Sequence, residues 1–379
     1  MRIITQILLL ITLCAEAQAQ KAKNVILFLA DAAGVPTVNA ASLHGHGEPQ
    51  KLFVQSWPHL ALSDTSTASA WVTDSAAGMT AIVTGRKTQN GVLSLDASTV
   101  RGAKDGAVLK TILEYAEERR LSTGVMTNVN IADATPAACY SHVNERSKFG
   151  EIFLQLFSPW FGDGVDVLAG VGRKAITDSM KKLGQDLDMV SKAKGRPVYK
   201  TLADVPAGEM RPLVVQDSPI DLPAAADMAL NRLSKNPRGY FLMIEWDAHT
   251  DNVKKGLDNV VAFDKLIRSV AQKVNLKETL LLFTADHSFD LSLYGGKRGE
   301  PLLNGLDEWT KANAGKKPEY TKLPSLRVFD DHTGEEVIAT AMGPGSERVN
   351  GFMPNTQLFR IMMQALGWQE TASAVRSTR

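Results

Sequence analysis

The chain has very little cysteine. Two of its 379 residues are cysteines, and one of them, Cys14, lies in the N-terminal stretch MRIITQILLLITLCAEAQAQ. Residues 1–19 contain a basic residue, an apolar run and then Ala17-Gln18-Ala19, which is the order typical of a cleaved secretory signal. A lipid anchor on Cys14 is the alternative, but the bulky Leu13 stands where such a cleavage site takes a small residue. We therefore expect an exported protein, periplasmic or secreted.

Cleavage of the signal leaves Cys139 alone, which excludes an intramolecular disulfide. An exported protein without disulfides must draw its stability from its core or from bound metal. The remaining residues 20–379 are long enough for one large core, and we expect a single α/β domain.

The chain also lacks a charge excess and a long apolar run. Lys+Arg number 42 and Asp+Glu 41, so no bulk field favours nucleic acid or an anionic membrane. Beyond the signal, no stretch approaches the roughly 18 consecutive apolar residues of a membrane-spanning helix. Internal repeats and low-complexity tracts are absent from the sequence. These absences predict no nucleic-acid or membrane partner, and any attraction for phosphate must be local.

What the chain does contain is an alternation of strand-like and helical patterns. Alternation of this kind predicts an α/β fold, a central mostly parallel sheet with helices on both faces. The strand-like runs are Val25–Ala30, Thr123–Thr127, Val165–Ala169, Tyr240–Glu245, Thr279–Ala285 and Glu336–Met342. The helical stretches are Ala107–Arg120, Pro223–Ser234, Leu257–Val274 and Asn355–Leu366. The Gly- and Lys-rich segment 294–323 has weak periodicity, and we interpret it as a small insertion.

Three of the predicted strands end in acids or histidine. VILFLA leads into Asp31, YFLMIE into Asp247 and His249, and LLLFTA into Asp286 and His287. Ligands of open parallel sheets bind beyond the carboxyl ends of the strands, so these side chains should gather at one edge. Carboxylates and imidazoles without cysteine suit zinc, and all-oxygen positions suit Mg²⁺. Each residue taken alone could instead be a strand-end turn or a helix cap.

Ser75 precedes an Ala-rich stretch that should be helical. A serine at that position is most often only a helix N-cap. A helix N-terminus also offers N–H groups that suit a phosphoryl group, and a nearby metal could activate the hydroxyl as a nucleophile. The spacing alone does not decide between these interpretations.

Longer motifs resemble the alkaline phosphatase family. They are NVILFLADAAG (24–34), VTDSAAGMTAIVTGRKTQNGVLSLD (72–96), TGVMTNVNIADATPAACYSHVNER (123–146), FLMIEWDAH (241–249), TADH (284–287) and DHTGEEVIATAMGPGSE (331–347). The resemblance spans nearly the whole chain after the signal. It implies a phosphomonoester hydrolase with two Zn²⁺ and one Mg²⁺, fastest at alkaline pH and assembled as a homodimer.

The resemblance also implies a role for individual residues. Ser75 matches the nucleophile that becomes phosphorylated, and Asp31 matches the acid that bridges a zinc and the magnesium. Asp286 and His287 would complete the zinc beside the serine, and His332 would hold the other zinc. Thr135 and Glu245 match the magnesium ligands, and Asp133 matches an acid that reaches magnesium through water. Arg146, four residues beyond His142 in a predicted helical turn, matches a phosphate-binding arginine.

One motif departs from the family pattern. EWDAH spaces the magnesium glutamate, the zinc aspartate and the zinc histidine more closely than the family does. Asp247 and His249 are our choice of ligands because both follow the strand end directly, and Asp251 is the alternative. Trp246 could line the cleft or pack beneath it.

Other functions are weighed against this one. A phosphodiesterase or nucleotide pyrophosphatase of the same superfamily resembles the chain at the zinc ligands but lacks counterparts of Thr135, Glu245 and Arg146. A sulfatase needs a Pro- and Arg-containing formylglycine motif, which Asp74-Ser75-Ala76-Ala77 does not match. A noncatalytic phosphate-binding protein would need no nucleophile.

Overall fold

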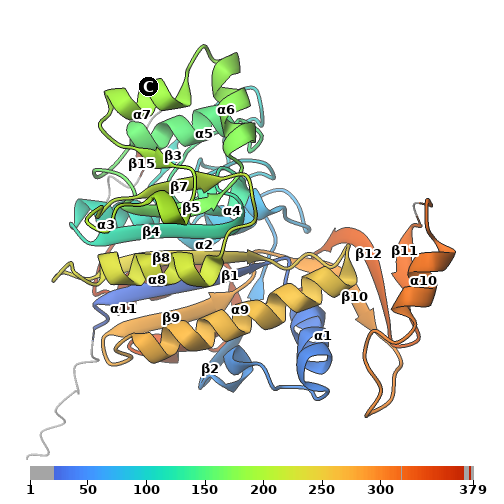
Figure 1. Cartoon of the computed structure of the whole chain (residues 1–379). Coiled ribbons are helices and arrows are strands. Elements are labelled where there is room, and N and C mark those ends of the chain that lie inside the picture. Colours follow the sequence, from blue (N-terminus) through green and yellow to red (C-terminus); the bar gives the residue numbers. More distant parts are fainter. Residues whose placement is uncertain (1–20, 317, 371–374, 377–379) are drawn as a thin grey trace, which may run out of the picture.

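The computed structural model describes residues 21–316, 318–370 and 375–376, and the predicted signal at residues 1–19 lies outside them. Within the described residues, strands form one ten-stranded sheet, one three-stranded sheet and one two-stranded pair, shown in Figure 1. The strands are β1 (Asn24–Asp31), β2 (His59–Asp64), β3 (Val108–Leu109), β4 (Ser122–Asn130), β5 (Val167–Val171), β6 (Val198–Tyr199), β7 (Leu213–Gln216), β8 (Tyr240–Asp247), β9 (Thr279–Thr284), β10 (Ser288–Leu293), β11 (Tyr320–Lys322), β12 (Leu326–Thr333), β13 (Val337–Met342), β14 (Gly351–Pro354) and β15 (Val375–Arg376).

The large sheet has the order β14-β2-β13-β9-β1-β8-β4-β5-β7-β6. Neighbours from β9 to β6 pair in parallel, and β13 runs antiparallel to both β9 and β2. The helices are α1 (Val35–His46), α2 (Ser75–Thr84), α3 (Ile112–Glu118), α4 (Ala134–Ala137), α5 (Phe149–Leu154), α6 (Arg173–Lys182), α7 (Leu187–Ala193), α8 (Leu222–Leu233), α9 (Val253–Lys273), α10 (Leu306–Ala312) and α11 (Thr356–Ala365). The predicted α/β fold is therefore confirmed.

The central strand β1 is apolar at nearly every position because both of its faces are covered. Val25, Leu27 and Leu29 face a core that includes residues of α2, α3 and α11. The alternate residues, among them Ile26 and Phe28, face a second core with residues of α1, α8 and α9. This double burial fixes the register of β1 and so the place where Asp31 leaves the sheet.

All six predicted strand-like runs overlap observed strands of the large sheet. The expected helix over residues 107–120 is wrong at its start, where Val108 and Leu109 form β3 and the helix begins only at Ile112. Thr111 is the reason, because its side chain accepts from the Glu114 backbone and Glu114 accepts from the Thr111 backbone, a capping box that fixes the helix start.

The segment 294–323 contains helix α10 and strand β11, which lie at the far right of Figure 1. There β11 pairs with β12, and β12 pairs with β10, to form the three-stranded sheet. Strand β10 begins directly after His287, and His332 lies near the end of β12, opposite Phe289 of β10. The start of β10 and the end of β12 therefore both lie at the predicted site.

Within the described part of the chain, no helix has the length and apolarity required to cross a membrane.

A buried acid on α3 makes stability depend on pH. Burial, and then the neighbouring carboxyl of Asp163, raises the pKa of Glu117 from 4.5 to about 9. The folded protein then holds a proton that the unfolded chain has released, so this group's contribution to stability falls as pH rises from about 4.5 to about 9. Glu117→Gln, a neutral isostere, should raise the Tm at pH 9 by several degrees and change it little at pH 5.

Thermal unfolding at pH 5, 7 and 9 measures this effect. Glu118→Gln is the matched control, because Glu118 is partly exposed and pairs with Lys110. An equal loss of Tm between pH 5 and pH 9 in wild type and Glu117→Gln would contradict the assignment.

Candidate active site and metal centre

Most of the predicted metal ligands lie at the carboxyl ends of four neighbouring strands, β9, β1, β8 and β4. Asp31 is the last residue of β1, and it lies opposite Asp247, the last residue of β8. Asp286 and His287 follow β9 after Ala285, and Asp133 and Thr135 follow β4. The parallel register therefore brings groups far apart in the sequence to one edge, as expected.

Ser75 is the first residue of α2 and is almost fully buried, at 3% exposure. Its Oγ lies 3.2 Å from Nε2 of His287. Asp74, not Ser75, caps the helix, since its carboxylate accepts from the Ala77 backbone N–H. Gly78 lets α2 pack closely, because a Cβ there would lie 2.6 Å from the carbonyl oxygen of Asp286. The interpretation of Ser75 as a helix N-cap is thus wrong, and the Ser75 hydroxyl contacts the predicted ligand His287.

Three histidines from separate segments lie together, and one of them, His287, contacts Ser75. Nδ1 of His287 donates to the Ser288 carbonyl at 3.0 Å, and Nδ1 of His332 donates to the Thr73 carbonyl at 3.1 Å. Nδ1 of His249 pairs with the Asp247 carboxylate at 2.9 Å. With Nδ1 of His287 and of His332 bonded to backbone carbonyls, Nε2 is left as the ligand atom of these two rings, which is the arrangement that orients metal-binding histidines.

Ligand atoms of these residues form two compact groups, His249 with His287 and His332, and Asp31 with Asp286 and His287. The atoms of each group lie within 4.8 Å of one another. The rings of His287 and His332 stack with centroids 3.8 Å apart. His287 belongs to both groups, so the two candidate metal positions are adjacent.

Four buried oxygens around this centre have no hydrogen-bond partner, namely Asp31 Oδ1, Asp286 Oδ2, Thr135 Oγ1 and Glu245 Oε2. Leaving a buried polar atom unpaired costs about 1–3 kcal/mol, so four together call for a ligand. All four are oxygens from residues that the sequence predicts as metal ligands. The donor set therefore fits bound zinc and magnesium.

The crowding of carboxylates at this centre also indicates bound cations. Burial, and then the charge of Asp31, raises the pKa of Asp286 to about 6 and that of Glu245 well above its usual range. Burial alone would also raise the pKa of Asp31, but His249 and His287 outweigh it and lower that pKa. Cations among these carboxylates would remove the repulsion.

Arg146 is fixed by two carboxylates. Its guanidinium contacts Asp74 at 3.2 Å and Asp133 at 2.9 Å. The expected helical turn around it is wrong, because Arg146 lies in a turn outside any helix, held by a bond from its N–H to the Gly91 carbonyl. Asp74 therefore joins the helix that carries Ser75 to the arginine.

Asp247 lies outside both ligand groups. Its carboxylate contacts His249 and, at 3.4 Å, the ammonium of Lys255. The alternative residue Asp251 is exposed to solvent and is in neither group. Trp246 packs against Phe263, with ring centroids 5.8 Å apart, among residues of the second core. Trp246 therefore packs beneath the site.

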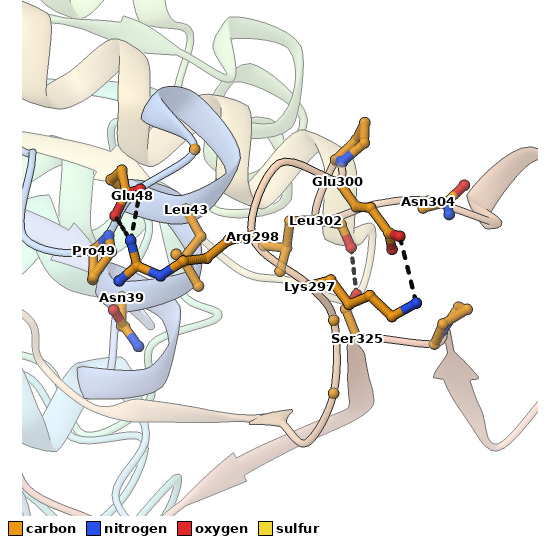
Figure 2. Close-up of a pocket in the computed structure, with 15 residues that line it drawn as sticks. Asn39, Leu43, Glu48, Pro49, Lys297, Arg298, Glu300, Leu302, Asn304 and Ser325 are labelled. Atoms are coloured by element: carbon orange, nitrogen blue, oxygen red, sulfur yellow. Dashed lines mark hydrogen bonds and ion pairs between the residues drawn. The ribbon is translucent and has the colours of Figure 1, made fainter.

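A separate cavity of about 320 Å³ lies between the C-terminal end of α1 and loop 295–304. Figure 2 shows Arg298 crossing toward Glu48 there, at 2.7 Å. None of the predicted site residues lines this cavity. A shallow metal centre that holds only a phosphoryl group does not need it.

Sequence reasoning missed the positioning role of Asp74. The signal was present, since an aspartate directly before an Ala-rich helical stretch is a typical N-cap. Lys255 was also missed, because its contact with Asp247 depends on where α9 begins.

A model of the family described as "Alkaline phosphatase" matches residues 22–197 and 208–323 of this chain, a range that ends before His332. The tissue-nonspecific alkaline phosphatase of Rattus norvegicus is 27% identical, over 91% of this chain and 83% of the rat enzyme. Alkaline phosphatase 4 of Bacillus subtilis is 26% identical, over 91% of this chain and 88% of the other.

Solved structures show a similar fold. The alkaline phosphatase of the Antarctic bacterium TAB5 superposes with a TM-score of 0.74 at 23% identity, covering 93% of this chain and 100% of the other. That of Thermus thermophilus gives a TM-score of 0.76 at 21% identity, covering 93% and 92%.

Proposed function

Since this chain belongs to the alkaline phosphatase family and so is a metal-dependent phosphomonoester hydrolase, we propose that it works through a phosphoseryl intermediate on Ser75. The observation that carries the proposal is the surroundings of the Ser75 hydroxyl. Ser75 Oγ lies 3.2 Å from Nε2 of His287, which belongs to both candidate ligand groups, and four of the proposed metal ligands carry buried oxygens without a hydrogen-bond partner.

We assign the metals by the two ligand groups. Asp31, Asp286 and His287 would hold one zinc beside Ser75, and Asp247, His249 and His332 would hold the other, the carboxylate of Asp247 lying 2.9 Å from His249. Asp31, Thr135 and Glu245 would hold magnesium, with Asp133 close by. When bound, the ions supply positive charge that lowers the pKa of the serine hydroxyl and neutralises charge on the departing oxygen.

The side chains of the protein perform the remaining work. Ser75 Oγ attacks phosphorus, a new Oγ–P bond forms, and the bond from phosphorus to the leaving alcohol breaks. Water then attacks the phosphoserine, which frees Ser75 and releases inorganic phosphate. Ser75 is the first residue of α2, so a phosphoryl group on it would lie at the positive end of the helix dipole, which favours negative charge.

Arg146 is proposed to hold two nonbridging phosphate oxygens, with Asp74 and Asp133 fixing the plane of its guanidinium. Arg146→Lys keeps the charge but loses the planar fork, so we expect kcat/KM to fall about 10- to 100-fold, the worth of one charge-assisted hydrogen bond. Steady-state kinetics with p-nitrophenyl phosphate measures this. Arg173→Lys is the control, since Arg173 pairs with Asp188, the second residue of α7. An unchanged kcat/KM in Arg146→Lys would refute the role.

Substrate choice tests the function itself. The unpartnered oxygens of Thr135 and Glu245, together with Arg146, support monoesters over diesters. We expect the protein to hydrolyse p-nitrophenyl phosphate far faster than its bis ester. A large preference for the diester would instead establish the phosphodiesterase alternative.

Two further proposals, the location of the protein and its oligomeric state, rest on the signal-like N-terminal stretch and on the family resemblance. We propose export to the periplasm or the medium, directed by residues 1–19, and assembly as a homodimer. N-terminal sequencing of the exported protein and sedimentation of the purified enzyme would test them.

A further inference from the structure

Trp71 is unusually exposed for a tryptophan. Its exposed fraction is 87%, the highest among the large hydrophobic residues that are exposed in the described chain. Tryptophan normally loses most of its surface to packing, since burial of its rings is strongly favourable. Single exposed apolar residues are common, so the position of Trp71 must decide whether its indole binds a ligand.

The backbone around Trp71 is held in place although its ring is free. Asn90 donates to the Val72 carbonyl at 3.1 Å and accepts from the Asp74 backbone N–H at 3.2 Å. On the other side, a Cβ at Gly334 would lie 3.0 Å from the carbonyl oxygen of Trp71. The loop 65–74 is thus fixed between two neighbouring loops.

This fixed segment lies at the catalytic centre. His332 donates to the Thr73 carbonyl at 3.1 Å, and Ser75 follows Asp74 at the start of α2. Trp71 therefore stands on the side of the centre where His332 lies. In the proposed function, an in-line displacement by Ser75 beside the Asp31, Asp286 and His287 group would place the departing alcohol opposite the serine, toward the second zinc position that His332 would help to hold. Phosphate itself is held by Arg146 and the metal ligands.

We propose that Trp71 is a specificity-determining residue, an aromatic platform for the leaving group of planar, aromatic phosphate monoesters. The inference rests on the proposed function, because it places the departing alcohol beside His332. Stacking on a solvent-exposed ring accepts any flat leaving group and adds affinity without taking part in the chemistry. Nothing in the phosphoryl site itself distinguishes one alcohol from another.

Three substrates test the inference, namely phenyl phosphate, adenosine 5′-monophosphate and glycerol 2-phosphate. Trp71→Ala should raise KM for the two aromatic substrates roughly three- to tenfold, the range expected for an aromatic pair. The KM for glycerol 2-phosphate and all three kcat values should stay within about twofold of wild type. Trp71→Phe should restore most of the lost affinity.

Phe352→Ala is the matched control, because Phe352 is 77% exposed and lies on the edge strand β14. An equal rise in KM for all three substrates, or no rise for the aromatic pair, would overturn the proposal. So would a change in sedimentation of Trp71→Ala, which would assign the ring to contact with a second copy. Failure of the wild-type protein to hydrolyse glycerol 2-phosphate would instead count against the proposed function.

Discussion

Ser75→Ala is expected to lower kcat/KM for p-nitrophenyl phosphate by several orders of magnitude. The variant keeps Asp74, so the α2 cap and the Asp74–Arg146 contact remain in place. It loses only the oxygen that lies 3.2 Å from His287. Because that oxygen is the proposed nucleophile, its loss removes the reaction path and not merely one contact.

The expected loss is specific to catalysis. Ser75→Ala should bind the same metal content as wild type and unfold within a degree or two of it. Ser69→Ala, an exposed serine of the same loop, should keep full activity. If Ser75→Ala retained phosphate release at a wild-type rate, the chain would not use a serine nucleophile.

Metal removal should have a comparably large effect, on stability as well as on activity. Without cations, Asp31, Asp286 and Glu245 share one buried region with unpartnered oxygens. A ligand present at a thousandfold excess over its Kd stabilises the folded state by about 4 kcal/mol, so stripping the ions should lower the Tm by many degrees. Calorimetry before and after dialysis against a chelator measures the shift.

Activity should disappear with the metal and return when Zn²⁺ and Mg²⁺ are added together. The control is the same chelator already saturated with both ions. This comparison also tests whether His287 alone activates Ser75 through their 3.2 Å contact. If it did, activity would persist after the metal ions are removed. Retention of activity and Tm after complete metal removal would contradict the metal centre.

The large sheet could be predicted because its central strands are buried on both faces and read as continuous apolar runs. The end of each apolar run also marks the end of its strand. The sequence therefore predicts that Asp31, Asp286 and His287 lie at strand ends. The short outer strands β6, β7 and β14 were missed, because two to four residues carry too little periodicity.

Other features of the site depend on contacts that no local pattern encodes. Which two of Asp247, His249 and Asp251 reach the centre depends on how the contracted EWDAH segment turns into α9. The structure places Asp247 against Nδ1 of His249 and leaves Asp251 in solvent. Trp246 was ambiguous for the same reason, since its packing partner Phe263 comes from the following helix.

The most direct test of the account is to trap the intermediate. Wild-type protein mixed briefly with p-nitrophenyl phosphate, quenched in acid and digested, should carry phosphate on the peptide that contains Ser75, as seen by mass spectrometry. Metal-free protein and Ser75→Ala should carry none. Phosphate on another side chain, or rapid turnover with no phosphate on Ser75 at any time, would contradict an activated serine at the meeting point of these strand ends.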